Sequence, residues 1–116
     1  MHSKKGRLSE WICHYAAANG NLEMLQWADN HGCPCDALVC AFAAGGGHLD
    51  ILKWLKKNNY KWDERTCNMA AGGGHLDVLI WAQKNGCPID NRAYLSAAFH
   101  GHNNILEWLR KNCRNN

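Results

Sequence analysis

The chain has 116 residues, of which 47% are hydrophobic and 20% are charged, and its formal net charge is +3. This length suits one domain rather than two, and the composition excludes an intrinsically disordered chain. No apolar run approaches the roughly 18 residues that a membrane-spanning helix needs, so we expect no membrane partner.

Residues 1–8 are basic and polar, and no apolar stretch follows them as a secretion signal would require. We therefore expect these residues to form a flexible, solvated tail that precedes the folded domain.

After this tail the sequence repeats four times. The clearest copies read Ala-Ala-Gly-Gly-Gly-His-Leu-Asp, at residues 43–50 and again 27 residues later at residues 70–77. Related segments begin at residues 16 and 97, in the same register and with no insertion. The chain is therefore predicted to be a repeat protein. Its units are residues 9–35, 36–62, 63–89 and 90–116.

Each unit is predicted to contain two helices joined by a turn. The first helix follows an N-cap residue, and these N-caps are Ser9, Asp36, Asp63 and Asp90. An alanine pair on this helix allows the neighbouring unit to approach closely, and a glycine cluster then ends the helix. The second helix begins near His75 in the third unit and ends at Asn85-Gly86. We expect an all-α chain of four helix–turn–helix repeats.

The residues of each unit resemble the ankyrin repeat, in which an Ala-Ala pair precedes Gly-His, an acidic residue and branched aliphatics. Residues 43–55 carry the clearest match, and the resemblance covers all four units. It differs in period, since ankyrin repeats usually have about 33 residues, and the missing residues fall where the family has its β-hairpin. The resemblance implies an ankyrin-like solenoid with shortened loops, whose concave side binds other proteins without enzymatic activity.

The short, Trp- and Cys-rich form of these units is similar to ankyrin arrays of large DNA viruses and some protists. Seven cysteines in a chain without a secretion signal favour reduced thiols. We therefore expect a cytoplasmic or nuclear location, or the host cytoplasm for a viral protein.

Repeat geometry also argues against disulfides within a column of equivalent cysteines. Cys13, Cys40 and Cys67 occupy one column, and stacked helices lie roughly 8–10 Å apart, beyond the reach of a disulfide. The exception is Cys35 with Cys40, because these two residues flank one helix start. Whether they bond is left open.

No cofactor or metal site is expected. The strongest metal candidates are Cys33, Cys35 and Cys40 with His31, but their spacing is not that of a zinc ribbon and no second pair completes it. The histidines after glycine, His48, His75 and His102, are expected to bridge loops by hydrogen bonds. The tryptophan column, Trp27, Trp54, Trp81 and Trp108, is expected to be core.

Function is expected where the units differ, on the face of the first helices opposite the alanines. That face comprises Trp11, His14 and Tyr15 in the first unit, Leu38 and Phe42 in the second, Arg65, Asn68 and Met69 in the third, and Arg92, Leu95 and Phe99 in the fourth. Aromatic residues, Met and Arg are enriched in protein interfaces. In the alternative interpretation, Tyr15, Phe42 and Met69 only fill gaps between adjacent units.

The leading prediction is a non-enzymatic protein-interaction module whose partner is a protein of unknown identity. One alternative is a structural or engineered repeat scaffold without a natural ligand. Nucleic-acid binding is a weaker alternative, because the acidic residues open the second helices and the basic residues close them, which complements the helix dipole. The first unit has no polar outer side, so the chain is expected to be a monomer or to self-associate weakly there.

Overall fold

A computed structural model describes the backbone of residues 3–33 and 35–112, and the side chains of residues 11–33 and 35–112. Eight helices and no strand occur in this part of the chain, which confirms an all-α fold. The helices are α1 (Ser3–Asn19), α2 (Leu22–Asn30), α3 (Ala37–Gly45), α4 (Leu49–Lys57), α5 (Glu64–Gly72), α6 (Leu76–Lys84), α7 (Asn91–Phe99) and α8 (Asn103–Asn112).

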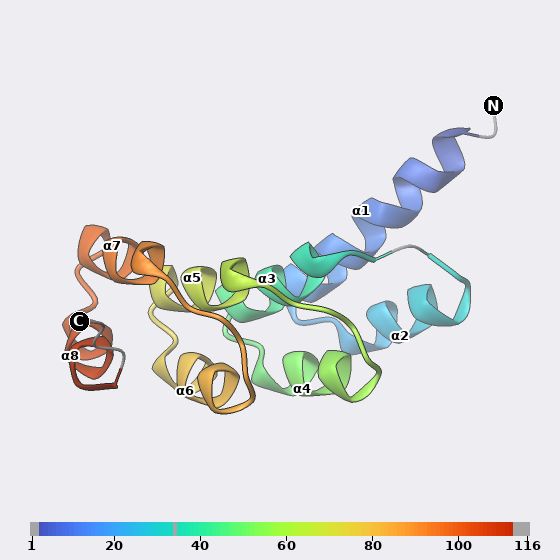
Figure 1. Ribbon diagram of the computed structural model, residues 1–116. Coiled ribbons are helices and arrows are strands. Elements are labelled where there is room, and N and C mark those ends of the chain that lie inside the picture. Colours follow the sequence, from blue (N-terminus) through green and yellow to red (C-terminus); the bar gives the residue numbers. More distant parts are fainter. Residues whose placement is uncertain (1–2, 34, 113–116) are drawn as a thin grey trace.

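The helices form two layers. The first helices of the units, α1, α3, α5 and α7, lie side by side in one layer, and α2, α4, α6 and α8 form the other (Figure 1). Each first helix contacts the first helix of the next unit and the second helix of its own unit. Helices stacked in this way give an elongated molecule of 50 × 25 × 22 Å.

The predicted caps of the first helices are confirmed in three of the four units. Asp36, Asp63 and Asp90 adopt extended backbone, and each side chain accepts a hydrogen bond from the backbone N–H two residues later. Ser9 was predicted to cap the first unit in the same way, and this is wrong because α1 begins at Ser3.

Residues 3–8 therefore belong to a helix and not to the expected tail, and residues 1 and 2 lie outside the described part. Lysine, arginine and leucine before Ser9 favour helix, and no proline ends α1 there.

The second helices begin and end as the glycine and asparagine signals predicted. A glycine with positive φ precedes each of them, for example Gly74 before His75, the N-cap of α6. Positive φ occurs again just after α2, α4 and α6, at Gly32, Asn59 and Gly86. Because few side chains tolerate this conformation, these residues fix where the helices stop.

The core lies between the two layers and is built from small and branched residues. The paired alanines of the first three units are fully buried, as are Val78, Leu79 and Ala82 on α6. The neighbouring Trp81 stands at the edge of this buried stripe and is only partly buried, and Trp54 and Trp108 pack against the core in the same way.

The prediction that the tryptophan column belongs to the core is wrong at Trp27, which is 50% exposed and stacks on His31 with ring centroids 4.1 Å apart. The Trp81 ring lies 5.8 Å from the Trp62 ring of the preceding unit, whereas α2 is the first helix of its layer and Trp27 has no such neighbour in the described part of the chain.

In the part of the chain that the structure describes, no helix combines the length and the apolar character needed to cross a bilayer.

Candidate protein-binding surface

Three histidines hold neighbouring units together and so position the surface of the first helices. The Nε2 atoms of His48, His75 and His102 lie 3.1 Å from the backbone oxygens of Ala18, Gly45 and Gly72, each in the preceding unit. A carbonyl only accepts, so each Nε2 carries the donated proton. The loop-bridging role predicted for these histidines is confirmed.

Close approach of the first helices buries part of the predicted face. A Cβ atom added to Gly45 would lie 2.9 Å from Met69 Cε, so Met69 of one unit packs onto the glycine of the unit before it. The gap-filling interpretation therefore holds for Met69. Asn68 is 8% exposed, which contradicts its predicted place on an open surface. Asn68 lies on α5, which packs against both α3 and α7, and this packing covers its side chain.

The other predicted residues reach the surface to different degrees. Four of them are largely exposed: Trp11 (67%), Tyr15 (61%), Leu95 (63%) and Phe99 (85%). Arg92 is also exposed, whereas His14, Leu38, Phe42, Arg65 and Met69 are partly buried. The exposed apolar residues thus lie on α1 and α7, at opposite ends of the first-helix layer (Figure 1). The exposed apolar residues therefore form two separate areas and not one continuous surface.

At the α1 end, aromatic rings from two helices lie together. The His14 ring is 6.4 Å from the Trp11 ring and 5.3 Å from the Phe42 ring, measured between centroids. Tyr15 lies one helical turn after Trp11 and so shares its face of α1. We call Trp11, His14, Tyr15 and Phe42 the α1–α3 patch. It is an amphipathic aromatic surface, the type on which protein interfaces concentrate their binding energy.

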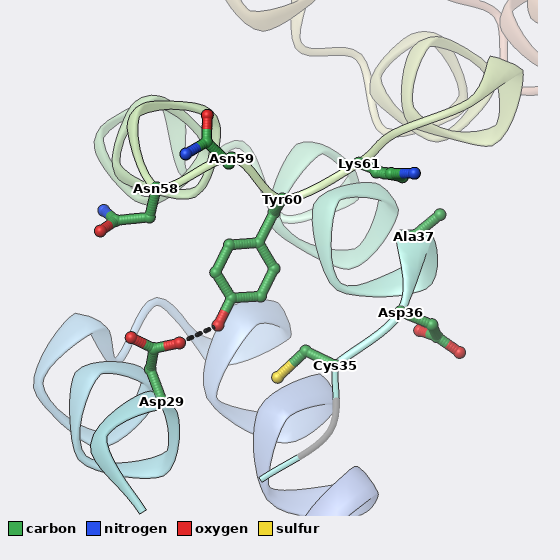
Figure 2. A pocket seen from close by; sticks show the side chains of 8 residues that line it. All are labelled: Asp29, Cys35, Asp36, Ala37, Asn58, Asn59, Tyr60 and Lys61. Carbon is green, nitrogen blue, oxygen red and sulfur yellow. Dashed lines mark hydrogen bonds between the residues drawn. The ribbon is translucent and has the colours of Figure 1, made fainter. Parts of the chain in front are cut away.

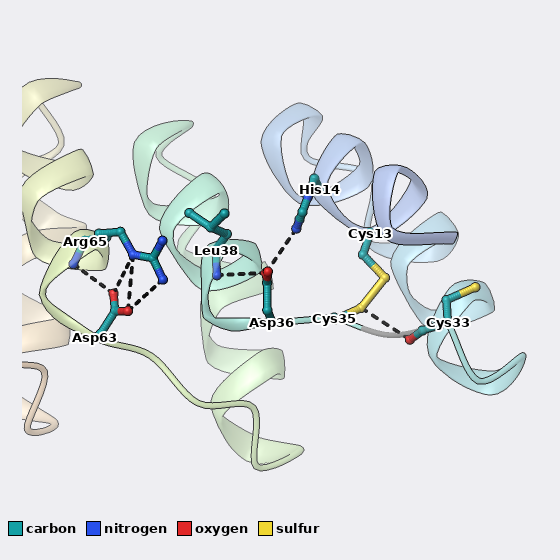
Figure 3. A network of polar contacts seen from close by, with 8 residues as sticks. All are labelled: Cys13, His14, Cys33, Cys35, Asp36, Leu38, Asp63 and Arg65. Atoms are coloured by element: carbon teal, nitrogen blue, oxygen red, sulfur yellow. Dashed lines mark hydrogen bonds and ion pairs between the residues drawn. A yellow bond between two sulfur atoms is a disulfide. The ribbon is translucent and has the colours of Figure 1, made fainter. Parts of the chain in front are cut away.

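His14 is fixed by the cap of the next unit. Its Nε2 lies 3.1 Å from Asp36 Oδ1, which also accepts the backbone N–H of Leu38 at 3.1 Å (Figure 3). Desolvation raises the pKa of Asp36, but the hydrogen bonds from His14 and Leu38 and the charge of His14 outweigh it, so the pKa is lowered. The carboxylate therefore orients the central ring of the α1–α3 patch.

The two predicted arginines are held by the caps of their own helices. Arg65 Nη2 lies 2.8 Å from Asp63 Oδ2, and Arg92 Nε lies 3.8 Å from Asp90 Oδ2. The hydrogen bonds from Arg65 lower the pKa of Asp63, and the carboxylate raises the pKa of Arg65. Because each guanidinium has a carboxylate beside it, these arginines add little net charge to the surface.

The prediction of reduced thiols is wrong for the first unit. Cys13 and Cys35 form a disulfide, with Cα atoms 6.1 Å apart (Figure 3). Sequence reasoning considered pairs within a column and the pair of Cys35 with Cys40. The loop that leads into α3 instead passes beside α1. Cys40 is not in a disulfide, and its burial raises the pKa of its thiol to about 12.

A pocket of about 620 Å³ lies between the first two units, away from the predicted face (Figure 2). The residues that line it are Asp29, Cys35, Asp36, Ala37, Asn58, Asn59, Tyr60 and Lys61. The Tyr60 hydroxyl donates to the Asp29 carboxylate across the pocket. Burial, followed by this hydrogen bond, raises the pKa of Tyr60. The hydrogen bond joins Tyr60 of the second unit to Asp29 of the first.

Metal ligands do not converge in the described residues, where no group of three or more His, Cys, Asp or Glu side chains could hold an ion. A scan against protein-family models finds no matching family, and a search of curated proteins finds no similar protein.

Proposed function

We propose that this chain is a non-enzymatic protein-interaction module built as an ankyrin-like solenoid, which binds a protein partner through the first helices. The solenoid rests on the 27-residue period together with the two layers of helices. The binding role rests on one observation above all, the exposed aromatic surface of the α1–α3 patch. Trp11 and Tyr15 remain 67% and 61% exposed there, although aromatic residues of this size usually bury much of their surface.

The proposed binding surface consists of a central aromatic part and less aromatic residues beside it. The α1–α3 patch is the centre, because its rings come from two helices and are held in place by Asp36. Leu38 lies on α3 with Phe42 of the patch, and Arg65 on α5 and Arg92 on α7 are the members of the predicted face on the following first helices. Leu95 and Phe99 form a second apolar area at the far end. A protein partner long enough to span the layer contacts both areas.

Photo-crosslinking tests this proposal. A photoreactive phenylalanine analogue placed at position 11 or 15 is expected to crosslink one protein from cells of the source organism. The matched control places the same analogue at position 27, which carries a tryptophan of the same unit that is also half-exposed but belongs to the other layer. Equal crosslinking from positions 11 and 27 contradicts the proposed surface.

A scaffold without a natural ligand is the alternative, and it predicts no specific crosslink at any of these positions. Self-association through the first unit is distinguished by light scattering. In that case the average mass rises with concentration in the unmodified chain and not in a variant with Trp11→Ala and Tyr15→Ala. Nucleic-acid binding predicts an affinity that falls steeply with salt concentration.

A further inference from the structure

Two cysteines of the third unit are buried at the same end of α5. Cys67 on α5 is fully buried, and Cys87, in the loop between α6 and α7, is 4% exposed. The Cys87 thiol donates to the backbone oxygen of Asp63 at 3.5 Å. Asp63 is the N-cap of α5 and precedes Cys67 by about one helical turn, so the Cys87 thiol lies at the part of α5 that carries Cys67.

The backbone holds Cys87 in this place. Its N–H donates to the Ala82 oxygen at 2.9 Å, directly after Gly86 with its positive φ. The same turn follows the second helix of the first unit, where the Cys33 N–H donates to the Ala28 oxygen at 3.0 Å. The turn that places Cys87 therefore recurs in the repeat and is not peculiar to the loop of the third unit.

In the first unit a disulfide already joins the first helix to the loop that follows the second helix. Cys13 is the counterpart of Cys67, and it is bonded to Cys35, two residues beyond the counterpart of Cys87. In the second unit the counterparts are Cys40 and Tyr60, which cannot form a disulfide. A first helix can therefore be bonded to the loop that follows the second helix of its own unit, and the third unit has thiols at both places.

We propose that Cys67 and Cys87 are an oxidisable pair, which a small disulfide such as glutathione disulfide converts into a second intrachain disulfide. The Cys87 thiolate attacks one sulfur of the small disulfide and releases one small thiol. The Cys67 thiolate then attacks the Cys87 sulfur and expels the second small thiol. The two protons of the protein thiols end on the released thiols, and the small disulfide takes up the two electrons.

Cys87 is the first nucleophile for two reasons. Hydrogen bonding by Cys67 lowers the pKa of the Cys87 thiol, despite burial, which raises it. Its loop is also at the surface, with exposed Asn85, Gly86 and Pro88 around it, whereas Cys67 is enclosed by α5 and its neighbours. The new bond ties α5 to the loop that follows α6, within the third unit.

The test treats the full chain with glutathione disulfide and maps disulfides by mass spectrometry after digestion without reductant. The expected product contains a Cys67–Cys87 crosslinked peptide, and its unfolding midpoint rises by roughly 5–15 °C. Cys40→Ser, which removes the other buried thiol near Cys87, is expected to form the same crosslink. Cys67→Ser is expected to stop at a mixed disulfide of Cys87 with glutathione, and this product shows that Cys87 can carry out the first step without Cys67.

A Cys40–Cys87 crosslink, or no crosslink in a chain whose circular dichroism shows it folded, overturns the proposal. A stable mixed disulfide at Cys87 in the unmodified chain also overturns it, because the second step then fails.

Discussion

At the scale of single residues, glycines determine how closely the units stack. A Cβ atom on Gly73 would lie 2.7 Å from the backbone oxygen of Gly45 in the preceding unit and 2.8 Å from the His75 ring. Gly73 has a negative φ of −84°, so alanine meets no backbone strain there, and the obstacles are the Gly45 carbonyl of the neighbouring unit and the His75 ring. Gly72 differs, since an added Cβ meets Ser96 Cβ at 3.3 Å and a small shift relieves the contact.

Gly73→Ala is therefore expected to destabilise the chain by about 1–3 kcal/mol, the usual cost of overpacking against atoms that cannot move aside. Gly72→Ala is the matched control and is expected to be close to neutral, because its slight crowding is offset by the better helix propensity of alanine. Urea unfolding measures both. A similar loss of stability in the two variants contradicts the stacking described here.

Asp63 makes stability depend on pH. Hydrogen bonds from Arg65 lower its pKa in the folded chain, so its contribution is complete above the ordinary carboxyl pKa of about 4 and is lost as the pH falls through the lowered value. Asp63→Asn keeps an N-cap side chain on α5 but cannot titrate. Urea unfolding between about pH 2 and pH 5 is expected to show a weaker pH dependence in this variant, and an unchanged dependence would rule out the assigned role.

The positions of Asn68 and Cys35 could not be predicted from the sequence. Asn68 was placed on the open face because its position on the helix allows it, but burial depended on how close the next helix comes. Cys35 was compared with Cys40 because both flank one helix start, whereas its partner Cys13 lies 22 residues away. Both outcomes depend on distances between elements, which the spacing of residues within one helix does not give.

At the scale of elements, the histidine that opens a second helix also fastens it to the previous unit. His75→Ala removes the donor to the Gly45 oxygen and is expected to cost about 1–3 kcal/mol, because that carbonyl loses its partner in a partly buried place. His100→Ala is the control, since His100 is exposed and bonds only to Ser96 of its own unit. Urea unfolding compares them, and equal changes would show that the bridge between units contributes nothing.

Helix boundaries were the part of the fold that the sequence predicted best. The aspartates before α3, α5 and α7 and the glycine or asparagine at helix ends act within a few residues, so their effect can be read without knowing the neighbours. The start of α1 was missed because Ser9 looks like the other caps, and nothing in the preceding lysines and arginine opposes a longer helix. A capping residue marks the first turn of a helix only where the residues before it disfavour helix.

At the scale of the molecule, the repeat predicts which residues are equivalent but not which of them stay exposed. Trp11 and Phe99 are exposed because they lie on the first and last helices of their layer, whereas Met69 packs between units. The tryptophans show the same effect, since Trp27 is half-exposed while Trp54 and Trp81 are partly buried by their neighbours. The exposed fraction of a side chain therefore depends on whether its unit lies at the end or in the middle of the stack. A binding surface assigned only from equivalent positions in the repeat includes residues that are buried between units.

The proposed binding surface is tested most directly by the affinity of the crosslinked partner for two tryptophan variants, measured by calorimetry. Trp11→Ala removes the most exposed ring of the α1–α3 patch and is expected to weaken binding at least about tenfold, as loss of a hot-spot aromatic does. Trp27→Ala removes a tryptophan of the same unit in the other layer and is expected to leave the affinity within about twofold. An unchanged affinity in Trp11→Ala, with a loss in Trp27→Ala, would place the binding surface on the second helices and contradict the account.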